Sequence, residues 1–277
     1  MSVWFITGIS RGLGRALTSA VLDRGHTVVG TTRTGTVDYR APGNRLHVVQ
    51  FDVADPAAAP TVLSRAYALA GGLDVVVNNA GYGLLGPVEG AGPDEVTHLF
   101  EVNFFGALRV IQAALPHLRS QGHGHLVNVS SIAALDPLPG SGVYAAAKSA
   151  LSALSESLSE ELGALGIGVT VVEPGSFRTD FLSSNSIRFS TSRIEGYDTT
   201  VGPVLNRFAD HAGHQSGDPD RAATVIIDAV QSDEPPLHLV LGADAVRRSR
   251  GRIQRLNADL DQWETPSAAT AFAPQDT

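Results

Sequence analysis

The sequence predicts an α/β fold, in which a single doubly wound domain is built on a mostly parallel seven-stranded sheet with helices on both faces. Two observations support this prediction. Short apolar runs alternate with helix-length amphipathic segments almost from end to end of the 277-residue chain. No repeat or linker divides the chain, whose length suits one large α/β domain. Parallel strands covered on both faces and joined by right-handed helical crossovers give this pattern.

The strands are expected where short apolar runs end at polar or glycine-containing turns. Strands buried in a parallel sheet are rich in Val, Ile and Leu because neighbouring helices cover both of their faces. In chain order, seven runs have this composition: Val3–Thr7, Thr27–Thr31, Leu46–Phe51, Leu73–Asn78, His125–Ser130, Gly168–Val172 and Leu237–Leu241.

The helices are expected where apolar residues recur every three or four positions, because that spacing places them on one helical face. Five segments between the apolar runs have this spacing: Leu13–Arg24, Thr61–Ala70, Pro93–Arg119, Gly142–Leu165 and Pro219–Val230.

Residues 181–217 show no clear regularity. An irregular segment of this size in a compact domain is usually a lid or a binding loop, so we expect it to contact the substrate. Residues 243–264 are again helical in pattern and rich in arginine, and we expect residues 265–277 to form a disordered tail.

Composition excludes several classes of function. The net charge of −8 argues against a nucleic-acid partner, and the absence of cysteine excludes disulfides, thiolate metal sites and cysteine nucleophiles. No apolar run has transmembrane length, and the N-terminus does not have the pattern of a secretory signal, so we expect a cytoplasmic protein without a membrane partner. His123–His125 reads HGH, but it lies away from the expected site, and we expect no metal.

The first strand runs into the glycine-rich stretch TGISRGLG, from Thr7 to Gly14. Glycines at positions 8, 12 and 14 allow a tight turn and a close approach of the backbone to a pyrophosphate. The following helix begins near Gly12, and its N-terminus favours negative charge. The stretch therefore predicts a dinucleotide-binding turn.

A second motif, YAAAK, contains the only lysine of the chain; the other 19 basic residues are arginines. Tyr144 and Lys148 are four residues apart, which places them on one face of a helix. Reduction of a carbonyl needs a proton donor with a pKa near neutrality, whereas free tyrosine has a pKa of about 10. A cation one helical turn away favours tyrosinate, so we expect Lys148 to lower the pKa of Tyr144.

The spacing T-G-x-x-x-G-x-G, together with YAAAK, resembles the short-chain dehydrogenase/reductase family. Four further family motifs follow in order: NNAG at Asn78–Gly81, VNFFG at Val102–Gly106, the pair Ser130–Ser131, and PGSFRT at Pro174–Thr179. The resemblance covers about residues 2–241. NAGYGLLGPVE, at Asn79–Glu89, looks closest to the hydroxysteroid-dehydrogenase and bacterial ketoreductase branch.

The resemblance implies a Rossmann-type domain over residues 1–242 and a role for four catalytic residues. Tyr144 would be the acid and base, Lys148 would tune it and hold the nicotinamide ribose, and Asn103 would support a water-linked proton path. The family serine that polarises the substrate oxygen stands 13 residues before the tyrosine, which gives Ser131 rather than Ser130.

The resemblance also implies the residues that contact the dinucleotide. Asp52 matches a position that contacts adenine, although an Asp at the end of a strand is also a common helix N-cap. Thr179 matches the residue that fixes the nicotinamide carboxamide. The full set is Gly8, Ser10, Arg11, Gly12, Leu13, Gly14, Arg33, Asp52, Val53, Asn79, Ala80, Gly81, Tyr144, Lys148, Pro174, Gly175, Phe177 and Thr179.

Charge predicts NADP(H) rather than NAD(H) as the cofactor. Enzymes that select NAD carry an acid about 20 residues beyond the glycine turn, where it holds the ribose 2′-hydroxyl. Here Thr32 takes that place and Arg33 follows it. Arg33, with Arg11 from the glycine loop, is suited to bind a 2′-phosphate. The alternative is that both arginines are solvated surface groups.

We therefore expect an NADP(H)-dependent oxidoreductase that interconverts a ketone or aldehyde and an alcohol. The apolar residues of 181–217 indicate a medium-sized, fairly apolar substrate. Two alternatives stay open: a non-catalytic dinucleotide-sensing protein on the same fold, and an epimerase or imine reductase that uses the same cofactor. Segments Pro93–Arg119 and Gly142–Leu165 match helices through which the family assembles, so we expect a homodimer or homotetramer.

Overall fold

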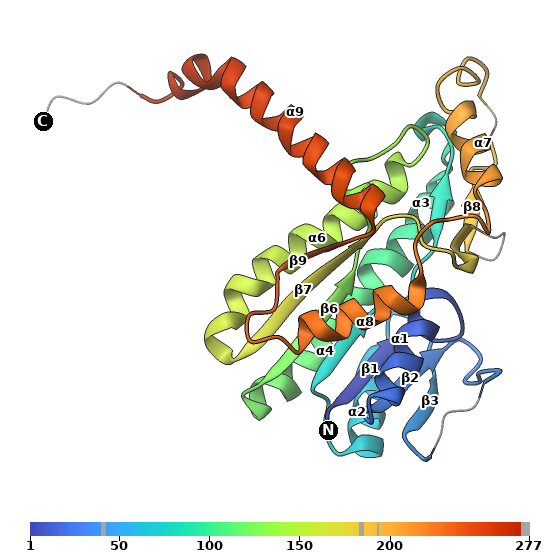
Figure 1. Ribbon diagram of the computed structural model, residues 1–277, viewed down its shortest axis with the longest axis vertical. Helices are drawn as coiled ribbons and strands as arrows, with labels where there is room; N and C mark the ends of the chain where they lie inside the picture. The colour runs from blue at the N-terminus through green and yellow to red at the C-terminus, as the bar shows by residue number, and fades with distance from the viewer. Residues whose placement is uncertain (40–42, 183–185, 193, 273–277) are drawn as a thin grey trace, which may run out of the picture.

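The computed structural model describes residues 1–39, 43–182, 186–192 and 194–272. Its centre is a seven-stranded sheet in which every strand pair is parallel, with the order β3-β2-β1-β4-β6-β7-β9 (Figure 1). The expected sheet is confirmed, and it is parallel throughout. Its strands are β1 (Val3–Thr7), β2 (Thr27–Thr32), β3 (Leu46–Gln50), β4 (Val75–Asn78), β6 (Gly124–Val129), β7 (Ile167–Pro174) and β9 (His238–Leu241).

Helices cover both faces of the sheet because the strands are apolar on both sides. Phe5 of β1 packs into the core beneath α2 (Ala58–Ala70), α4 (Gly106–Gln121) and α6 (Gly142–Leu162). Its neighbours Trp4 and Ile6 point to the opposite core, beneath α1 (Gly12–Asp23) and α8 (Pro219–Val230). This alternation along one strand produces the doubly wound architecture.

The segment expected as one helix over Pro93–Arg119 consists of three parts. The α-helix α3 (Pro93–Phe100) leads into the π-helical segment η2 (Glu101–Phe105), and α4 follows directly. π-helical turns are rare and occur mostly at functional sites. This one contains Asn103.

Several short elements were not expected from the sequence. Strands β5 (Gly83–Leu85) and β8 (Ile187–Phe189) form a separate two-stranded parallel sheet. The expectation that 181–217 has no regular structure is wrong, since it contains β8, α7 (Gly202–Asp210) and part of η4 (Asp180–Leu182). Residues 183–185 and 193 of that segment lie outside the described part. The other short helices are η1 (Val88–Gly90), α5 (Ile132–Leu135) and η3 (Gly163–Leu165).

The C-terminal helix α9 (Ala243–Ala268) extends four residues beyond its expected end at 264. Its base is packed on the domain, where Ala245 and Ser249 are buried, and the remainder projects away from the body (Figure 1). Residues 273–277 of the expected tail lie outside the described part. Within the described ranges, no helix is long and apolar enough to cross a membrane.

Candidate active site

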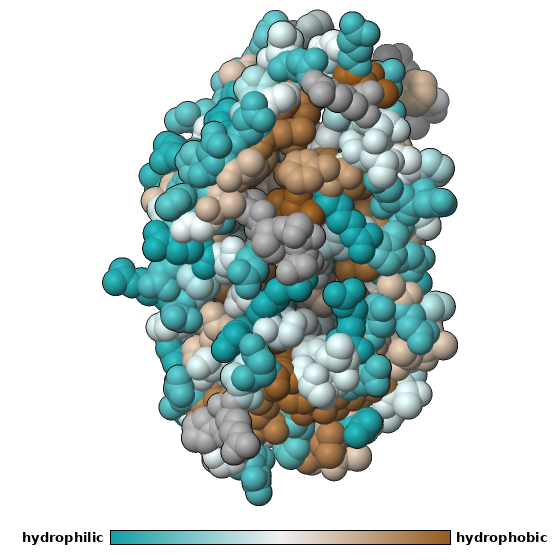
Figure 2. Space-filling model, turned by 90° about the vertical axis from the view of Figure 1, so that its right-hand side faces the viewer, coloured by the Kyte–Doolittle hydropathy of each residue, from teal (hydrophilic) through white to brown (hydrophobic). Residues whose placement is uncertain are grey.

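A cavity of about 380 Å³ opens at the carboxyl ends of the parallel strands. In doubly wound sheets this is the edge at which ligands bind. Figure 2, which faces the side of the molecule where α7 and β8 lie in Figure 1, shows brown apolar side chains recessed between teal polar ones. Every residue predicted to contact the dinucleotide lines this cavity.

The glycine-rich turn lies at one end of the cavity and has little free space. Gly8 and Gly12 have φ angles of 74° and 57°, in the left-handed region that favours glycine. A Cβ atom on Gly14 would lie 2.4 Å from both the Asn79 amide nitrogen and the Gly8 carbonyl oxygen. The Asn79 side chain fixes the turn by donating to the carbonyl oxygens of Thr7 (2.8 Å) and Gly8 (3.1 Å). The backbone therefore forms a narrow cradle at the N-terminus of α1.

The charged side chains that line the cavity are mostly basic. Arg11 of the glycine-rich turn and Arg33 are among them, and Asp52 is the only carboxylate among the described lining residues. The Asp52 side chain accepts a hydrogen bond from the Ala54 amide at 3.0 Å. Asp52 is not a helix N-cap, because α2 begins at Ala58. A basic lining of this kind suits an anionic ligand.

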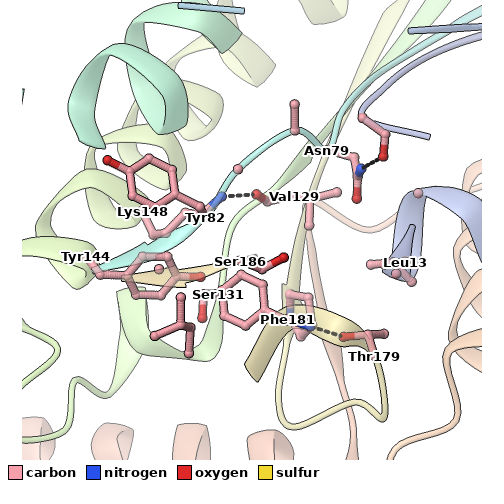
Figure 3. A pocket seen from close by; sticks show the side chains of 18 of the residues that line it. Leu13, Asn79, Tyr82, Val129, Ser131, Tyr144, Lys148, Thr179, Phe181 and Ser186 are labelled. Carbon is pink, nitrogen blue, oxygen red and sulfur yellow. Dashed lines mark hydrogen bonds between the residues drawn. The ribbon is translucent and has the colours of Figure 1, made fainter. Parts of the chain in front are cut away.

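Tyr144 and Lys148 lie one turn apart on α6 and are both buried, with exposed fractions of 8% and 4%. The Lys148 ammonium donates to the Val129 carbonyl oxygen at 2.8 Å (Figure 3). Gly81 leaves room for this ammonium, since a Cβ atom there would lie 3.3 Å from Lys148 Nζ and 2.9 Å from Asn103 Oδ1.

Burial determines the pKa of both groups. It raises the pKa of Tyr144 to about 12, and the hydrogen bond with the Ser131 side chain only partly opposes that rise. Burial also lowers the pKa of Lys148 to about 8. The expectation that Lys148 lowers the pKa of Tyr144 is therefore wrong here. Desolvation of the phenolate is the largest cause of the shift, and the Lys148 ammonium is hydrogen-bonded to the Val129 carbonyl oxygen.

The two serines after β6 have different surroundings. The Ser130 hydroxyl donates to the Lys148 carbonyl oxygen at 3.0 Å and lies 2.8 Å from the Ser152 hydroxyl, which fixes it against α6. The Ser131 hydroxyl accepts a hydrogen bond from the Ala133 amide at 3.1 Å, as the N-cap of α5. Figure 3 shows Ser131 beside the Tyr144 ring. Ser131 and Tyr144 both line the cavity, whereas Ser130 is bonded to α6, and the catalytic role of Ser131 stays a prediction.

Asn103 is the one predicted site residue that does not line the cavity. It is 1% exposed and bonds both polar groups of the Tyr82 backbone: its oxygen accepts from the amide at 3.0 Å, and its nitrogen donates to the carbonyl at 2.8 Å. Asn103 therefore fixes the loop after β4, directly behind Gly81 and Lys148.

The PGSFRT stretch closes the cavity beyond β7. Thr179 accepts a hydrogen bond from the Phe181 amide at 3.2 Å, and Phe177 pairs with Gly217 in an isolated parallel bridge. The base of α9 packs here, because a Cβ atom on Gly175 would lie 2.4 Å from an oxygen of Asp244. Pro174, Gly175, Phe177 and Thr179 thus line one wall.

Residues 181–217 were expected to contact the substrate, and Phe181 and Gln215 of that segment line the cavity, whereas Arg248 of α9 was not expected there. Gln215 is 2% exposed, and neither its amide nitrogen nor its amide oxygen has a hydrogen-bond partner among the described residues. Such an orphaned buried amide beside a cavity is typical of a ligand contact. The Phe181 ring lies 6.1 Å from that of Tyr144, and Arg248 reaches the cavity from α9. Only tertiary packing brings these residues to the site.

The residues that could hold a metal are not grouped. In the described part of the chain, no cluster of three His, Cys, Asp or Glu side chains could hold a metal ion. Of the HGH residues, His125 is buried in β6, where its ring nitrogen lies 2.9 Å from the Thr170 hydroxyl.

Comparison with known proteins gives one family. The family model described as short chain dehydrogenase matches residues 2–188. Oxidoreductase BOA17 of Botryotinia fuckeliana (strain B05.10) is 35% identical over 97% of this chain and 99% of its own. The 17-beta-hydroxysteroid dehydrogenase type 1 of Homo sapiens is 32% identical over 71% of this chain and 60% of its own. A short-chain dehydrogenase structure from Streptomyces avermitilis has a TM-score of 0.91 and 38% identity, and covers 98% of this chain and 99% of its own.

Proposed function

The chain belongs to the short-chain dehydrogenase/reductase family of NAD(P)-dependent oxidoreductases, and we propose that it uses NADP(H) to interconvert a ketone or aldehyde and an alcohol. The observation that carries the proposal is the buried pair of Tyr144 and Ser131, which lie side by side at the wall of the cavity (Figure 3), with Lys148 one helical turn from Tyr144.

The residues at the strand ends fit a dinucleotide. The cradle between Gly8, Gly14 and Asn79 has no room for a side chain, so backbone atoms are available for a pyrophosphate at the N-terminus of α1. Arg11 and Arg33 suit a 2′-phosphate, and the position at which NAD-selecting enzymes carry an acid is occupied by the uncharged Thr32. When bound, this cofactor supplies or accepts the hydride, which no side chain can provide.

Tyr144 is proposed to donate the proton to the substrate oxygen. With a pKa raised to about 12 by burial, its hydroxyl stays protonated at neutral pH and can act as the acid of carbonyl reduction. Ser131 is placed to hydrogen-bond the same oxygen as charge develops on it. The Lys148 ammonium adds positive charge nearby, and Asn103 holds the loop that surrounds it.

The substrate is proposed to be fairly apolar and of medium size. Leu85, Leu138, Phe181, Ile187 and Phe208 line the cavity. Apolar walls with a few convergent polar groups are typical of sites for small molecules. The human relative is named for a hydroxysteroid, a compound with a hydroxyl on an apolar skeleton.

The proposal is tested by Tyr144→Phe, assayed by cofactor absorbance with a panel of ketones and alcohols. Removal of a general acid lowers turnover by about 10²–10⁴-fold. The variant should still bind the reduced cofactor with wild-type affinity, because the phenol acts on the substrate oxygen. A Tyr144→Phe variant that retained wild-type turnover would contradict the proposal.

A further inference from the structure

The projecting part of α9 carries an apolar stripe that is exposed in the described structure. Residues 252–268 are all exposed, including four large apolar side chains: Ile253 (57%), Leu256 (45%), Leu260 (60%) and Trp263 (60%). Their spacing of three, four and three residues places them on one helical face. Ala245 and Ser249, which pack on the body, lie on the same face. The buried face of the helix therefore continues beyond the body without a partner (Figure 1).

Apart from Asp244 in the first turn, the charges of α9 run against the dipole of the helix. Near its N-terminal end the helix carries Arg247, Arg248, Arg250, Arg252 and Arg255, and near its C-terminal end Asp259, Asp261 and Glu264. An isolated helix is stabilised by the opposite arrangement, with acids at its N-terminus and bases at its C-terminus. Asp136 of the same chain pairs with Arg248 and Arg255, and an oppositely directed partner helix would in addition place the other arginines opposite the acids of the second helix.

We propose that the projecting half of α9 pairs with α9 of a second copy of this chain, in antiparallel orientation. Ile253 would then face Trp263 of the second copy, and Leu256 would face Leu260. In this orientation Arg250 approaches Glu264 of the other helix at both ends of the pair, which attracts, whereas Asp259 of the two copies approach each other once at its centre, which repels. A parallel pair would instead bring Asp259 close to Glu264, which repels. This contact is separate from the one expected through Pro93–Arg119 and Gly142–Leu165.

The absence of cysteine makes the pairing directly testable by disulfide formation. Full-length Ile253→Cys and Trp263→Cys proteins, distinguished by mass, are mixed and oxidised. The mixture should give a disulfide-linked heterodimer as the main product, whereas either variant alone gives little. A variant alone gives little product because its cysteine and the same cysteine of the second copy are ten residues apart in this register, about 15 Å along the helix. A disulfide needs Cα atoms within about 7 Å.

Gln254→Cys mixed with Gln262→Cys is the matched control, because these residues lie at equivalent heights on the opposite face. Glu264→Arg should lower the yield of the heterodimer about threefold to tenfold, since exposed ion pairs are individually weak. Adding Arg250→Glu to the same chain should restore it. Equal linkage in the control pair, equal linkage of each variant with itself, or no linkage in the mixture would overturn the proposal.

Discussion

Replacement of Lys148 by methionine should make the stability of the protein less dependent on pH. The folded-state pKa of Lys148 is lowered by burial, from 10.5 to about 8. Below pH 8 both the folded and the unfolded chain carry the proton, so the folded state bears the full cost of a buried ammonium. Between pH 8 and 10.5 only the unfolded chain keeps the proton, and the free energy of unfolding of the wild type rises with pH. Lys148→Met lacks this rise.

The size of the effect follows from the same two pKa values. The difference between 10.5 and about 8 corresponds to about 3 kcal/mol, of which most should be recovered by pH 10. The lost hydrogen bond to the Val129 carbonyl costs about 1–3 kcal/mol at every pH, so the absolute stabilities at pH 7 stay close. Measurements should end at pH 10, because the raised pKa of Tyr144 lowers stability only above that value.

Urea unfolding from pH 6 to 10, at one protein concentration, measures this change. Lys148→Arg is the control, because a guanidinium stays charged throughout this range and should show no rise from this position. Parallel curves for wild type and Lys148→Met would refute the argument that burial depresses the pKa of this lysine. Turnover of both variants should be low. Lys148 would then be a residue that lowers stability at neutral pH and that catalysis needs.

Four further substitutions separate roles at the site. Ser131→Ala should lower the kcat of carbonyl reduction by about 10²-fold, whereas Ser130→Ala should lower the free energy of unfolding by about 1–2 kcal/mol with little change in kcat; the reverse result would reassign the two serines. Arg33→Asp should shift relative binding from NADPH toward NADH about tenfold to a hundredfold, and titration showing that the wild type binds NADH as tightly as NADPH would contradict the predicted preference. Gln215→Leu should raise both the thermal stability without ligand and the Kd for the cofactor; an unchanged Kd would remove Gln215 from the binding site.

The sequence predicted the sheet because its strands and helices have strong periodic patterns. Each of the seven expected strands is present, and α8 has exactly the expected bounds, Pro219–Val230. The glycine turn and YAAAK could be placed because each depends on local geometry: a strand followed by a helix, and four residues on one helical face. The structure brings these motifs to one cavity, as the carboxyl edge of a parallel sheet requires.

What the sequence did not predict depends on contacts between distant segments. Strands β5 and β8 have three residues each and pair across about a hundred positions, so no local pattern marks them. The proposed role of Gln215 depends on its lacking hydrogen-bond partners among the described residues, which only the folded structure shows. The pKa of Tyr144 depends on its burial, which cannot be derived from the four-residue spacing between Tyr144 and Lys148. Motif spacing therefore places chemical groups, whereas packing determines their protonation.

Packing also explains why the only lysine stands at position 148. The ammonium lies in a buried space bounded by Gly81 and donates to the Val129 carbonyl oxygen. A guanidinium is larger, has five donors in a fixed plane and stays charged. In this space most of those donors would be left without partners, at a cost of about 1–3 kcal/mol for each buried group. A compact cation that can lose its proton fits where an arginine would not, even in a chain that otherwise uses arginine for every fixed positive side chain.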